Sequence, residues 1–389
     1  MSAIDTARYL EIFRKELFKS VVPFWLEHSL DNRYGGYFNC LDRDGSLYDT
    51  TKYMWLQGRM VWMFSRLYNT VEMDGRWLEA AAIGADFIRR YGKAPDGRVY
   101  FSLTEDGRPV FMQRKMYSEL FYSLALDEFS RATGDNRLKE EAVAMFEFAL
   151  GLAEHPERLG RPILAGQQRA CSLAAPMILL STANQLTAGG QGPDYDEMKK
   201  RWVRDILLHM DQRRRIVLEN VAPDGSMLAG SEGRLMNPGH AIEAGWFVLE
   251  HLGADGPEDL QRAALDMIEW SFERGWDAEY GGIYYFLDSE NRPPQQLEWP
   301  MKLWWPLCEA LYGLLLAWRR TGEDHFADKF GRAWDYIDTH FRDPRYGEWF
   351  GYLDRSGKPT HLLKGGPYKC FYHVPRALLF CIKLLEEIA

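Results

Sequence analysis

The sequence is poor in cysteine, shows no excess of basic residues and contains no long uncharged stretch, and each absence excludes a class of protein. Its five cysteines among 389 residues are irregularly spaced without a CxxC pair, which argues against a disulfide framework and a zinc knuckle. A net charge of −9 without a basic stripe argues against binding of nucleic acid or an anionic membrane. No stretch is apolar enough to span a bilayer, and the charged amphipathic start is unlike a signal peptide. These features indicate a soluble, cytoplasmic globular protein.

Apolar and aromatic residues are abundant, at 46% and 14% of the chain, and they accompany a hidden repeat. Six glycine-bearing turns recur 57 to 65 residues apart, and several have the pattern of a short hairpin with alternating aromatic residues. The turns are centred near Gly35, Gly97, Gly160, Gly225, Gly282 and Gly347. Six turns predict six structural units.

Two helical segments lie between successive turns, and the two kinds of segment differ in polarity. Residues 75–92 carry charges along one face, whereas residues 116–134 are mostly apolar. An amphipathic helix belongs on the outside of a fold, and a nearly apolar helix belongs inside. Six helical hairpins with a buried inner ring predict an all-α (α/α)6 barrel. We expect one domain over residues 1–389, with short β-hairpins in the connecting loops.

Isolated polar residues on the predicted inner helices are the candidate site, because burying them unpaired costs about 2–7 kcal/mol each. Five of the six inner helices supply them, and a ring of helices directs them toward one axial cavity. The set is Arg59, Glu119, His240, Glu243, Glu309 and His373. Taken singly, each has a structural alternative, such as an ion pair between Arg59 and Glu309. As a set, they favour a functional site.

The two histidines share a local context at the start of a helix. Asn237 is the predicted N-cap and Pro238 the first helical residue, which places His240 in the first turn. Pro375 begins the last inner helix by the same rule, with His373 at or just before its cap. A helix N-terminus disfavours imidazolium, so we expect both rings to be neutral near pH 7.

Two further groups of residues are weaker candidates. Tyr53, Trp55 and Trp304 either fill a wide core or stack on the C–H faces of a sugar at the cavity mouth. The motif "KGGPYK" at 364–369 is a candidate phosphate or nucleotide site, although it lacks the P-loop spacing. Its proposed contacts are Lys364, Gly365, Gly366 and Lys369.

The chain resembles the N-acylglucosamine 2-epimerase family over nearly its whole length. Long blocks carry the resemblance, including "KYMWLQGRMVWMFSRLY", "NPGHAIEAGWF", "QLEWPMKLWWP" and "DPRYGEWFGYL". The resemblance implies an (α/α)6 barrel that interconverts N-acetylglucosamine and N-acetylmannosamine. It assigns an essential arginine to Arg59, acid/base histidines to His240 and His373, and an essential glutamate to Glu309. It also implies a homodimer that ATP activates without being hydrolysed.

We expect the sugar to open to its aldehyde, one histidine to remove the C2 proton and the other to return a proton on the opposite face. Arg59 would stabilise the enolate oxygen, and Glu243 with Glu309 would orient the histidines or assist ring opening. No metal or redox cofactor is expected, because the product is an isomer of the substrate.

Three alternatives stay open at this point. Related barrels epimerise or isomerise unmodified sugars such as mannose, glucose and cellobiose. A glycoside hydrolase on the same fold would use two carboxylates, Glu309 with Glu243 or Glu119. A non-catalytic sugar-binding protein is the third alternative.

Overall fold

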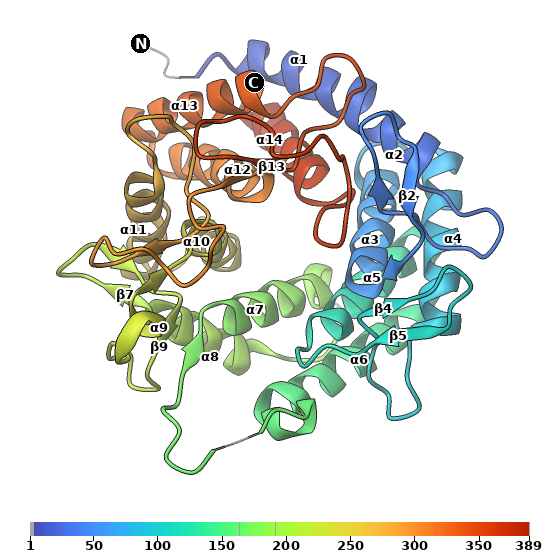
Figure 1. The fold of residues 1–389 in the computed structure, drawn as a ribbon, viewed down its shortest axis with the longest axis horizontal. Helices are drawn as coiled ribbons and strands as arrows, with labels where there is room; N and C mark the ends of the chain where they lie inside the picture. Colours follow the sequence, from blue (N-terminus) through green and yellow to red (C-terminus); the bar gives the residue numbers. More distant parts are fainter. Residues whose placement is uncertain (1–3, 163, 191, 389) are drawn as a thin grey trace.

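The computed structural model describes residues 4–162, 164–190 and 192–388, and its helices form two concentric rings (Figure 1). The inner ring consists of α3 (Met54–Thr70), α5 (Tyr117–Thr133), α7 (Ala174–Leu186), α10 (Pro238–Leu252), α12 (Trp304–Thr321) and α14 (His373–Ile388). The outer ring consists of α1 (Thr6–Glu16), α4 (Gly75–Tyr91), α6 (Asn136–Glu154), α8 (Asp196–Leu207), α11 (Glu258–Gly275) and α13 (Asp324–His340). Helix α1 continues through a π-helical turn (Leu17–Val21) into α2 (Val22–His28). A short helix, α9 (Gly230–Arg234), precedes α10. The predicted (α/α)6 barrel is confirmed.

Each inner helix packs against an outer helix. Five pairs are consecutive in the chain, from α3 with α4 to α12 with α13, whereas α14 pairs with α1. The first and last helices therefore lie side by side (Figure 1), and Arg14 of α1 pairs with Glu386 of α14 at 2.6 Å. The sixth hairpin is formed by the two chain ends, and it closes the ring.

The polarity of each helix explains its ring. In α12, every residue from Trp304 to Ala317 is buried, as expected for a helix that is apolar all round. In α4, the buried residues follow the helical period on one face, from Trp77 to Ile88. One continuous hydrophobic core runs from Ile4 to Leu385. Among the described residues, no helix has the length and apolar character needed to cross a membrane.

Five of the six predicted glycine turns form antiparallel bridges. The bridged pairs are Leu30–Tyr37, Lys93–Val99, Val221–Met227, Trp276–Ile283 and Arg342–Trp349. Gly160 instead caps a 3₁₀ helix (Pro156–Leu159). All six turn glycines have φ between 73° and 87°, which explains why glycine recurs there.

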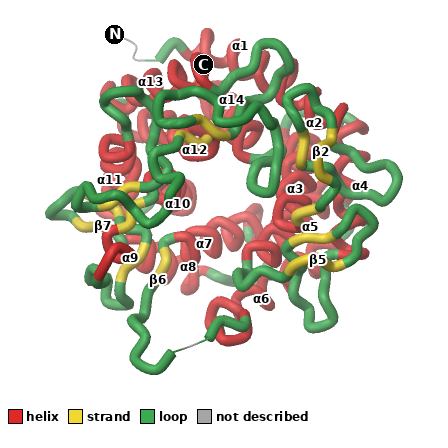
Figure 2. Tube along the Cα trace, in the orientation of Figure 1, coloured by secondary structure: helices red, strands yellow, loops and turns green. Residues whose placement is uncertain are grey.

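Short strands lie in the loops that connect the helices (Figure 2). Local hairpins, as predicted, join β1 (Cys40–Leu41) to β2 (Leu47–Asp49), β4 (Ser102–Leu103) to β5 (Pro109–Phe111) and β7 (Met210–Asp211) to β8 (Ile216–Val217). Unpredicted pairs join successive units: β3 (Lys52–Tyr53) with β4, β6 (Cys171–Ser172) with β9 (Asn220–Val221), β10 (Leu235–Met236) with β11 (Leu287–Asp288), and β12 (Lys302–Leu303) with β13 (Tyr352–Leu353). Because β3, β6, β10 and β12 directly precede inner helices, these pairs position the helix N-termini.

A buried aspartate–lysine pair recurs beside three of the glycine turns. The pairs are Asp31–Lys52 at 2.5 Å, Asp277–Lys302 at 3.0 Å and Asp343–Lys364 at 3.0 Å. Each aspartate also accepts backbone N–H groups of its own turn. The lysine side chains are fully buried, so each pair ties a turn to the segment that follows it.

Candidate active site

The two candidate catalytic histidines lie at the N-terminal ends of two inner helices, α10 and α14, which flank α12 in the ring. Asn237 caps α10 as predicted, because its Oδ1 accepts the His240 backbone N–H at 3.2 Å, with Pro238 as the first helical residue. Helix α14 begins at His373, two residues before the predicted start at Pro375. The local sequence thus places both rings at the positive end of a helix.

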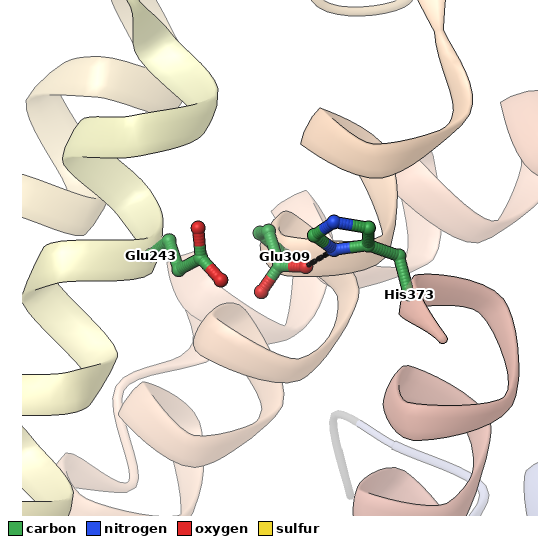
Figure 3. A group of neighbouring side chains, drawn as sticks. All are labelled: Glu243, Glu309 and His373. Carbon is green, nitrogen blue, oxygen red and sulfur yellow. Dashed lines mark hydrogen bonds and ion pairs between the residues drawn. The ribbon is translucent and has the colours of Figure 1, made fainter. Parts of the chain in front are cut away.

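Three side chains from α10, α12 and α14 converge beside this end of the barrel (Figure 3). Nδ1 of His373 lies 2.6 Å from Oε1 of Glu309. The guanidinium of Arg376 donates to the same Glu309 oxygen at 2.7 Å and to Oε1 of Glu243 at 2.7 Å. Arg376 therefore links the two glutamates.

The environment of His373 keeps its ring neutral. Burial, together with the positive charges of Arg59 and Arg376, holds the pKa of His373 well below the usual histidine value. A neutral ring that donates its Nδ1–H to Glu309 leaves the lone pair of Nε2 free to accept a proton. The predicted neutral state agrees with this geometry.

The environment of His240 has the opposite effect and favours the protonated ring, against the influence expected from the helix start. Its Nδ1 lies 3.0 and 3.1 Å from the two carboxylate oxygens of Glu219. Burial alone would lower the pKa of His240, but the Glu219 carboxylate outweighs burial and raises the pKa above the ordinary value. The helix N-terminus is therefore not the dominant influence on this ring.

Trp305 contacts both histidines. Its ring centroid is 5.2 Å from that of His240 and 6.0 Å from that of His373. The predicted contact residue, Trp304, is only 2% exposed and packs against Tyr352 at 5.2 Å and His373 at 6.4 Å. Trp305 is thus an aromatic neighbour of both histidine rings, and Trp304 contacts His373 edge-on.

Arg59 is held by aromatic faces and has no ion pair among the residues that the structure describes. Its guanidinium lies 4.4 Å from the Trp55 ring, 4.2 Å from Phe121 and 5.0 Å from Tyr372. The possible pair with Glu309 is not formed, because Glu309 binds Arg376 and His373. A cation held without a counterion is suited to stabilise an anionic intermediate.

Three buried donors around this cluster lack a partner among the described residues. They are Nε of Arg59 and the indole N–H groups of Trp55 and Trp304. Buried donors are normally satisfied, so unpaired donors in one region point to a polar ligand with hydroxyl or carbonyl acceptors.

Two predicted contact residues lie in other surroundings. Glu119 is buried and paired with Arg98 at 3.0 Å, and it also accepts the Val99 N–H at 3.1 Å. Its partners are therefore outside the histidine cluster, which favours a structural role. Tyr53 is half-buried and packs against Phe101 at 5.5 Å, at the residue that precedes α3.

The structure places both lysines of "KGGPYK" inside the protein. Lys364 belongs to the repeated pair with Asp343, and Lys369 pairs with Glu348 at 2.7 Å. Their side chains are 0% and 1% exposed. Neither ammonium group faces solvent, so the geometry does not favour the predicted phosphate site.

Packing also explains the two glycines of that motif. A Cβ at Gly365 would lie 2.0 Å from the backbone oxygen of Asn39, so only glycine permits this close approach. The carbonyl of Gly366 accepts from the Asn39 amide at 2.8 Å. The backbone of the motif is thus bound to the β1 segment.

The cluster of Glu243, Glu309 and His373 also has ligand types suited to a metal ion, with donor atoms within 4.8 Å of one another. However, Nη2 of Arg376 lies 2.7 Å from both glutamates and 3.4 Å from Nδ1 of His373. A divalent cation would have to displace this guanidinium, so the residues present do not fit a metal well.

Sequence reasoning missed two members of the site: Glu219 and Arg376. Arg376 stands three residues after His373 in "HVPR", a spacing that puts both on one helical face. Glu219 is a single charge after the apolar run "IVL", but it lies between strands and not on an inner helix. A search that includes charges in the connecting loops would have found it.

Comparison with known proteins identifies the same family that the sequence resembles. Residues 36–377 match the family described as N-acylglucosamine 2-epimerase (GlcNAc 2-epimerase). The chain belongs to this family. It is 44% identical over 382 residues to N-acylglucosamine 2-epimerase of Rattus norvegicus, covering 95% of this chain and 90% of that protein.

More distant relatives of the chain are cellobiose 2-epimerases. A cellobiose 2-epimerase of Ruminococcus albus is 25% identical over 396 residues, covering 96% of this chain and 97% of that protein. The solved structure of cellobiose 2-epimerase from Bacillus thermoamylovorans superimposes with a TM-score of 0.80 at 21% identity. That match covers 98% of this chain and all of the other, which confirms the barrel.

Proposed function

We propose that this epimerase interconverts N-acetyl-D-glucosamine and N-acetyl-D-mannosamine by moving a proton at C2. Support for the N-acylated sugar comes from the 44% identity to the rat enzyme over nearly the whole chain. The cellobiose epimerases are much less similar, at 25%. Unmodified sugars are therefore the less favoured substrates.

The observation that carries the proposal is the pair of histidines with opposite charge preferences. His373 is held neutral and His240 is biased toward its protonated form, and both contact one tryptophan. Neighbouring groups whose pKa values are pushed apart provide an acid and a base at the same pH. Epimerisation needs such a pair on opposite faces of one carbon.

The reaction begins when the sugar ring opens to the aldehyde. Nε2 of His373 takes the C2 proton of one epimer, and the C–H electron pair forms a double bond to C1 while the carbonyl oxygen becomes an enolate. Arg59, which has no ion-pair partner among the residues that the structure describes, stabilises that oxygen. His240 then gives its proton to C2 from the opposite face, and the other epimer reacts with the roles exchanged.

The carboxylates orient the histidines. Glu309 and Glu219 hold the Nδ1 atoms of His373 and His240, which leaves each Nε2 for the sugar. Glu243 is bound to Arg376 and contributes negative charge near both rings. Because both Glu243 and Glu309 are paired with Arg376, they are poorly suited to serve as the free acid and base of a glycoside hydrolase.

A matched set of variants tests the mechanism. His240→Ala and His373→Ala should each lower kcat at least about a hundredfold, the usual contribution of a general acid or base. His155→Ala, at a 61% exposed side chain, is the control and should retain full activity. In deuterated water the wild type should place deuterium at C2 of the product. Full activity in either active-site variant would exclude the two-histidine mechanism.

A substrate panel tests the sugar. N-acetylmannosamine should turn over faster than mannose, glucose or cellobiose, and a preference for any unmodified sugar would contradict the proposal.

We further propose that no metal or redox cofactor takes part, because the product is an isomer of the substrate, and that ATP raises the rate, as the family resemblance implies. Assays with EDTA, and with and without ATP, test these two statements separately.

We also propose a cytoplasmic homodimer. All five cysteines are free thiols, which suits a reducing compartment. Sedimentation should give a mass of twice the 45.2 kDa chain, and a monomer at micromolar concentration would contradict the dimer.

A further inference from the structure

Each turnover of the proposed reaction leaves the histidine pair in a different charge state from the one in which it began. Nε2 of His373 ends with the C2 proton of the sugar, and His240 ends without the proton that it gave. The sugar loses one proton and gains one, so the reaction itself does not reverse this exchange. A second turnover in the same direction therefore requires His373 to lose a proton and His240 to gain one.

The charged groups around the two rings make these two states unequal in energy. Those that act on His373 are Arg59, Arg376, Glu243, Glu309 and His240. Those that act on His240 are Glu219, Glu243 and Lys115. Two arginines thus oppose a proton on His373, whereas two carboxylates against one lysine favour a proton on His240. The state with a neutral His373 and a protonated His240 is therefore the resting state of the free enzyme.

Arg376 is fixed directly against His373. It stands one turn after His373 on α14 and is 4% exposed, with its guanidinium 4.7 Å from the Tyr372 ring and 5.2 Å from the Trp246 ring. Its Nη2 lies 2.7 Å from Oε1 of Glu309, the oxygen that His373 also contacts, and 3.4 Å from Nδ1 of His373. A protonated His373 would therefore place a second positive charge against a guanidinium that is held by its neighbours.

The two rings also differ in their access to water. The side chain of His240 is 28% exposed, whereas that of His373 is 9% exposed. His240 can therefore regain a proton from water readily, whereas His373 has to release one from a mostly buried position. The release from His373 is the step that needs a driving force, and repulsion by Arg376 provides one.

We propose that Arg376 is a positioning residue that resets the histidine pair after each turnover, by repelling the proton that His373 has taken from the sugar. That proton passes from Nε2 of His373 to water, and His240 takes one from water, so the exchange balances without another reactant. The reset rests on the proposed function, whereas the effect of Arg376 on the charge of His373 does not.

NMR of the full-length protein with isotope-labelled histidine tests the charge states. At about pH 6.5, the ordinary pKa of histidine, the free wild type should have a neutral His373 and a protonated His240. His373→Ala and His240→Ala assign the two signals. Arg376→Gln should raise the pKa of His373, because it removes a positive charge and leaves Glu309 unshared with an arginine. Arg376→Lys should raise this pKa less, because lysine keeps the charge but lacks the fork that holds both glutamates.

The order of these pKa values distinguishes the charge of Arg376 from a merely structural role. A defect in packing alone would not place Arg376→Lys between the wild type and Arg376→Gln. The control is Arg201→Gln, which removes the same charge from a 66% exposed side chain of α8 and should leave both histidine signals unchanged.

Isotope exchange tests the reset itself. The enzyme is brought to equilibrium with radiolabelled N-acetylglucosamine and N-acetylmannosamine, and excess unlabelled N-acetylglucosamine is then added. Where turnover is faster than the reset, enzyme left in the swapped state converts labelled N-acetylmannosamine back, so label moves transiently into N-acetylglucosamine. The sugar concentration at which this begins, multiplied by kcat/KM, gives the rate of the reset, so a slower chemical step cancels. Arg376→Gln should lower this rate at least about tenfold, the smallest usual effect of a neighbouring charge on proton affinity.

Three results would overturn the proposal. These are a His373 signal that titrates alike in the wild type and Arg376→Gln, equal reset rates in these two proteins, or a protonated His373 in the free wild type. If Arg376→Gln does not fold, identical titration of His373 in the wild type and Arg376→Lys overturns it. If Arg376→Gln folds without turning over, its titration decides. An absence of epimerisation in the wild type would refute the proposed function, while the titration would still report on Arg376.

Discussion

At the scale of single residues, both catalytic histidines contact a carboxylate through Nδ1, yet their charge preferences differ. The difference lies in what else each carboxylate binds. Glu309 shares its charge with Arg376, and a second guanidinium, that of Arg59, also acts on His373. Glu219 forms its ion pair with His240, and its charge is not shared with an arginine in the described chain. Glu219 therefore stabilises the protonated ring of His240, whereas Glu309, which also pairs with Arg376, does not stabilise a protonated His373.

This difference predicts the pH dependence of the enzyme. Activity requires one proton on the histidine pair, so it should rise with pH through the pKa of His373 and fall through that of His240. Since Glu219 raises the pKa of His240, Glu219→Gln should lower that pKa and move the alkaline limb to lower pH. The acid limb should stay in place, and kcat/KM at pH 8 should fall about tenfold. The measurement is kcat/KM against pH.

The control for this prediction is Glu197→Gln, a substitution at an 85% exposed side chain of α8. It should leave both limbs unchanged. Glu219→Asp retains the charge and should restore part of the alkaline shift, which a merely structural defect would not do. An alkaline limb at the same pH in wild type and Glu219→Gln would contradict the role of Glu219.

The site residues whose position could be predicted are those that a local sequence signal, such as a helix start, places in the fold. Asn237 and Pro238 specify the start of α10, and so they place His240 from local sequence alone. The pairing of Arg376 with Glu243 joins residues 133 positions apart. No local pattern specifies such a contact, so the charge of each ring could not be derived from the helix start.

At the scale of elements, the repeated aspartate–lysine pairs fasten the turns to the inner ring. Lys52 and Lys302 stand in the strands that directly precede α3 and α12. Each lysine therefore sets where an inner helix begins relative to the glycine turn before it. The same pairing explains Lys364, whose sequence context suggested a phosphate contact.

Breaking one of these pairs should be costly. Lys52→Met would leave Asp31, whose side chain is 2% exposed, without its cation, and would also remove donors to two backbone carbonyls. We expect the free energy of unfolding to fall by about 3–5 kcal/mol, measured by denaturant titration. Lys200→Met breaks a pair whose side chains are 60% and 85% exposed, and should cost less than about 1 kcal/mol. Equal effects would contradict the structural role.

The elements themselves were predictable because hydrophobic periodicity and turn glycines are local signals. The strand pairs between units were not, since β6 and β9 are only two residues long and pair across an intervening helical hairpin. Strands of this length carry no pattern of their own. Their partners are determined by the closed ring, which brings successive loops together.

At the scale of the whole molecule, closure depends on the contacts of the first helix, α1, with the last part of the chain: with α14, its partner in the ring, and with α13 and the segment that follows α13. Phe13 of α1 is fully buried and packs against Trp334 at 4.8 Å and Phe330 at 6.2 Å, both from α13. Glu16 adds buried polar contacts, accepting from the Trp349 indole at 3.0 Å and pairing with Arg342 at 2.6 Å. The repeat in the sequence predicts six units, but only the structure shows that the chain ends complete the sixth.

If the main core is one cooperative unit, a defect at the contact between α1 and α13 should destabilise the entire barrel. Phe13→Ala should lower the free energy of unfolding by about 3–5 kcal/mol, the range for a buried phenylalanine. Tryptophan fluorescence and helical circular dichroism should shift together as one transition, because the core runs without a break from Ile4 to Leu385. Met73→Ala, at an 80% exposed residue, should change stability by less than about 0.5 kcal/mol. Two separate transitions in Phe13→Ala would mean that the ring contains more than one domain, contrary to the assignment of residues 1–389 to a single domain.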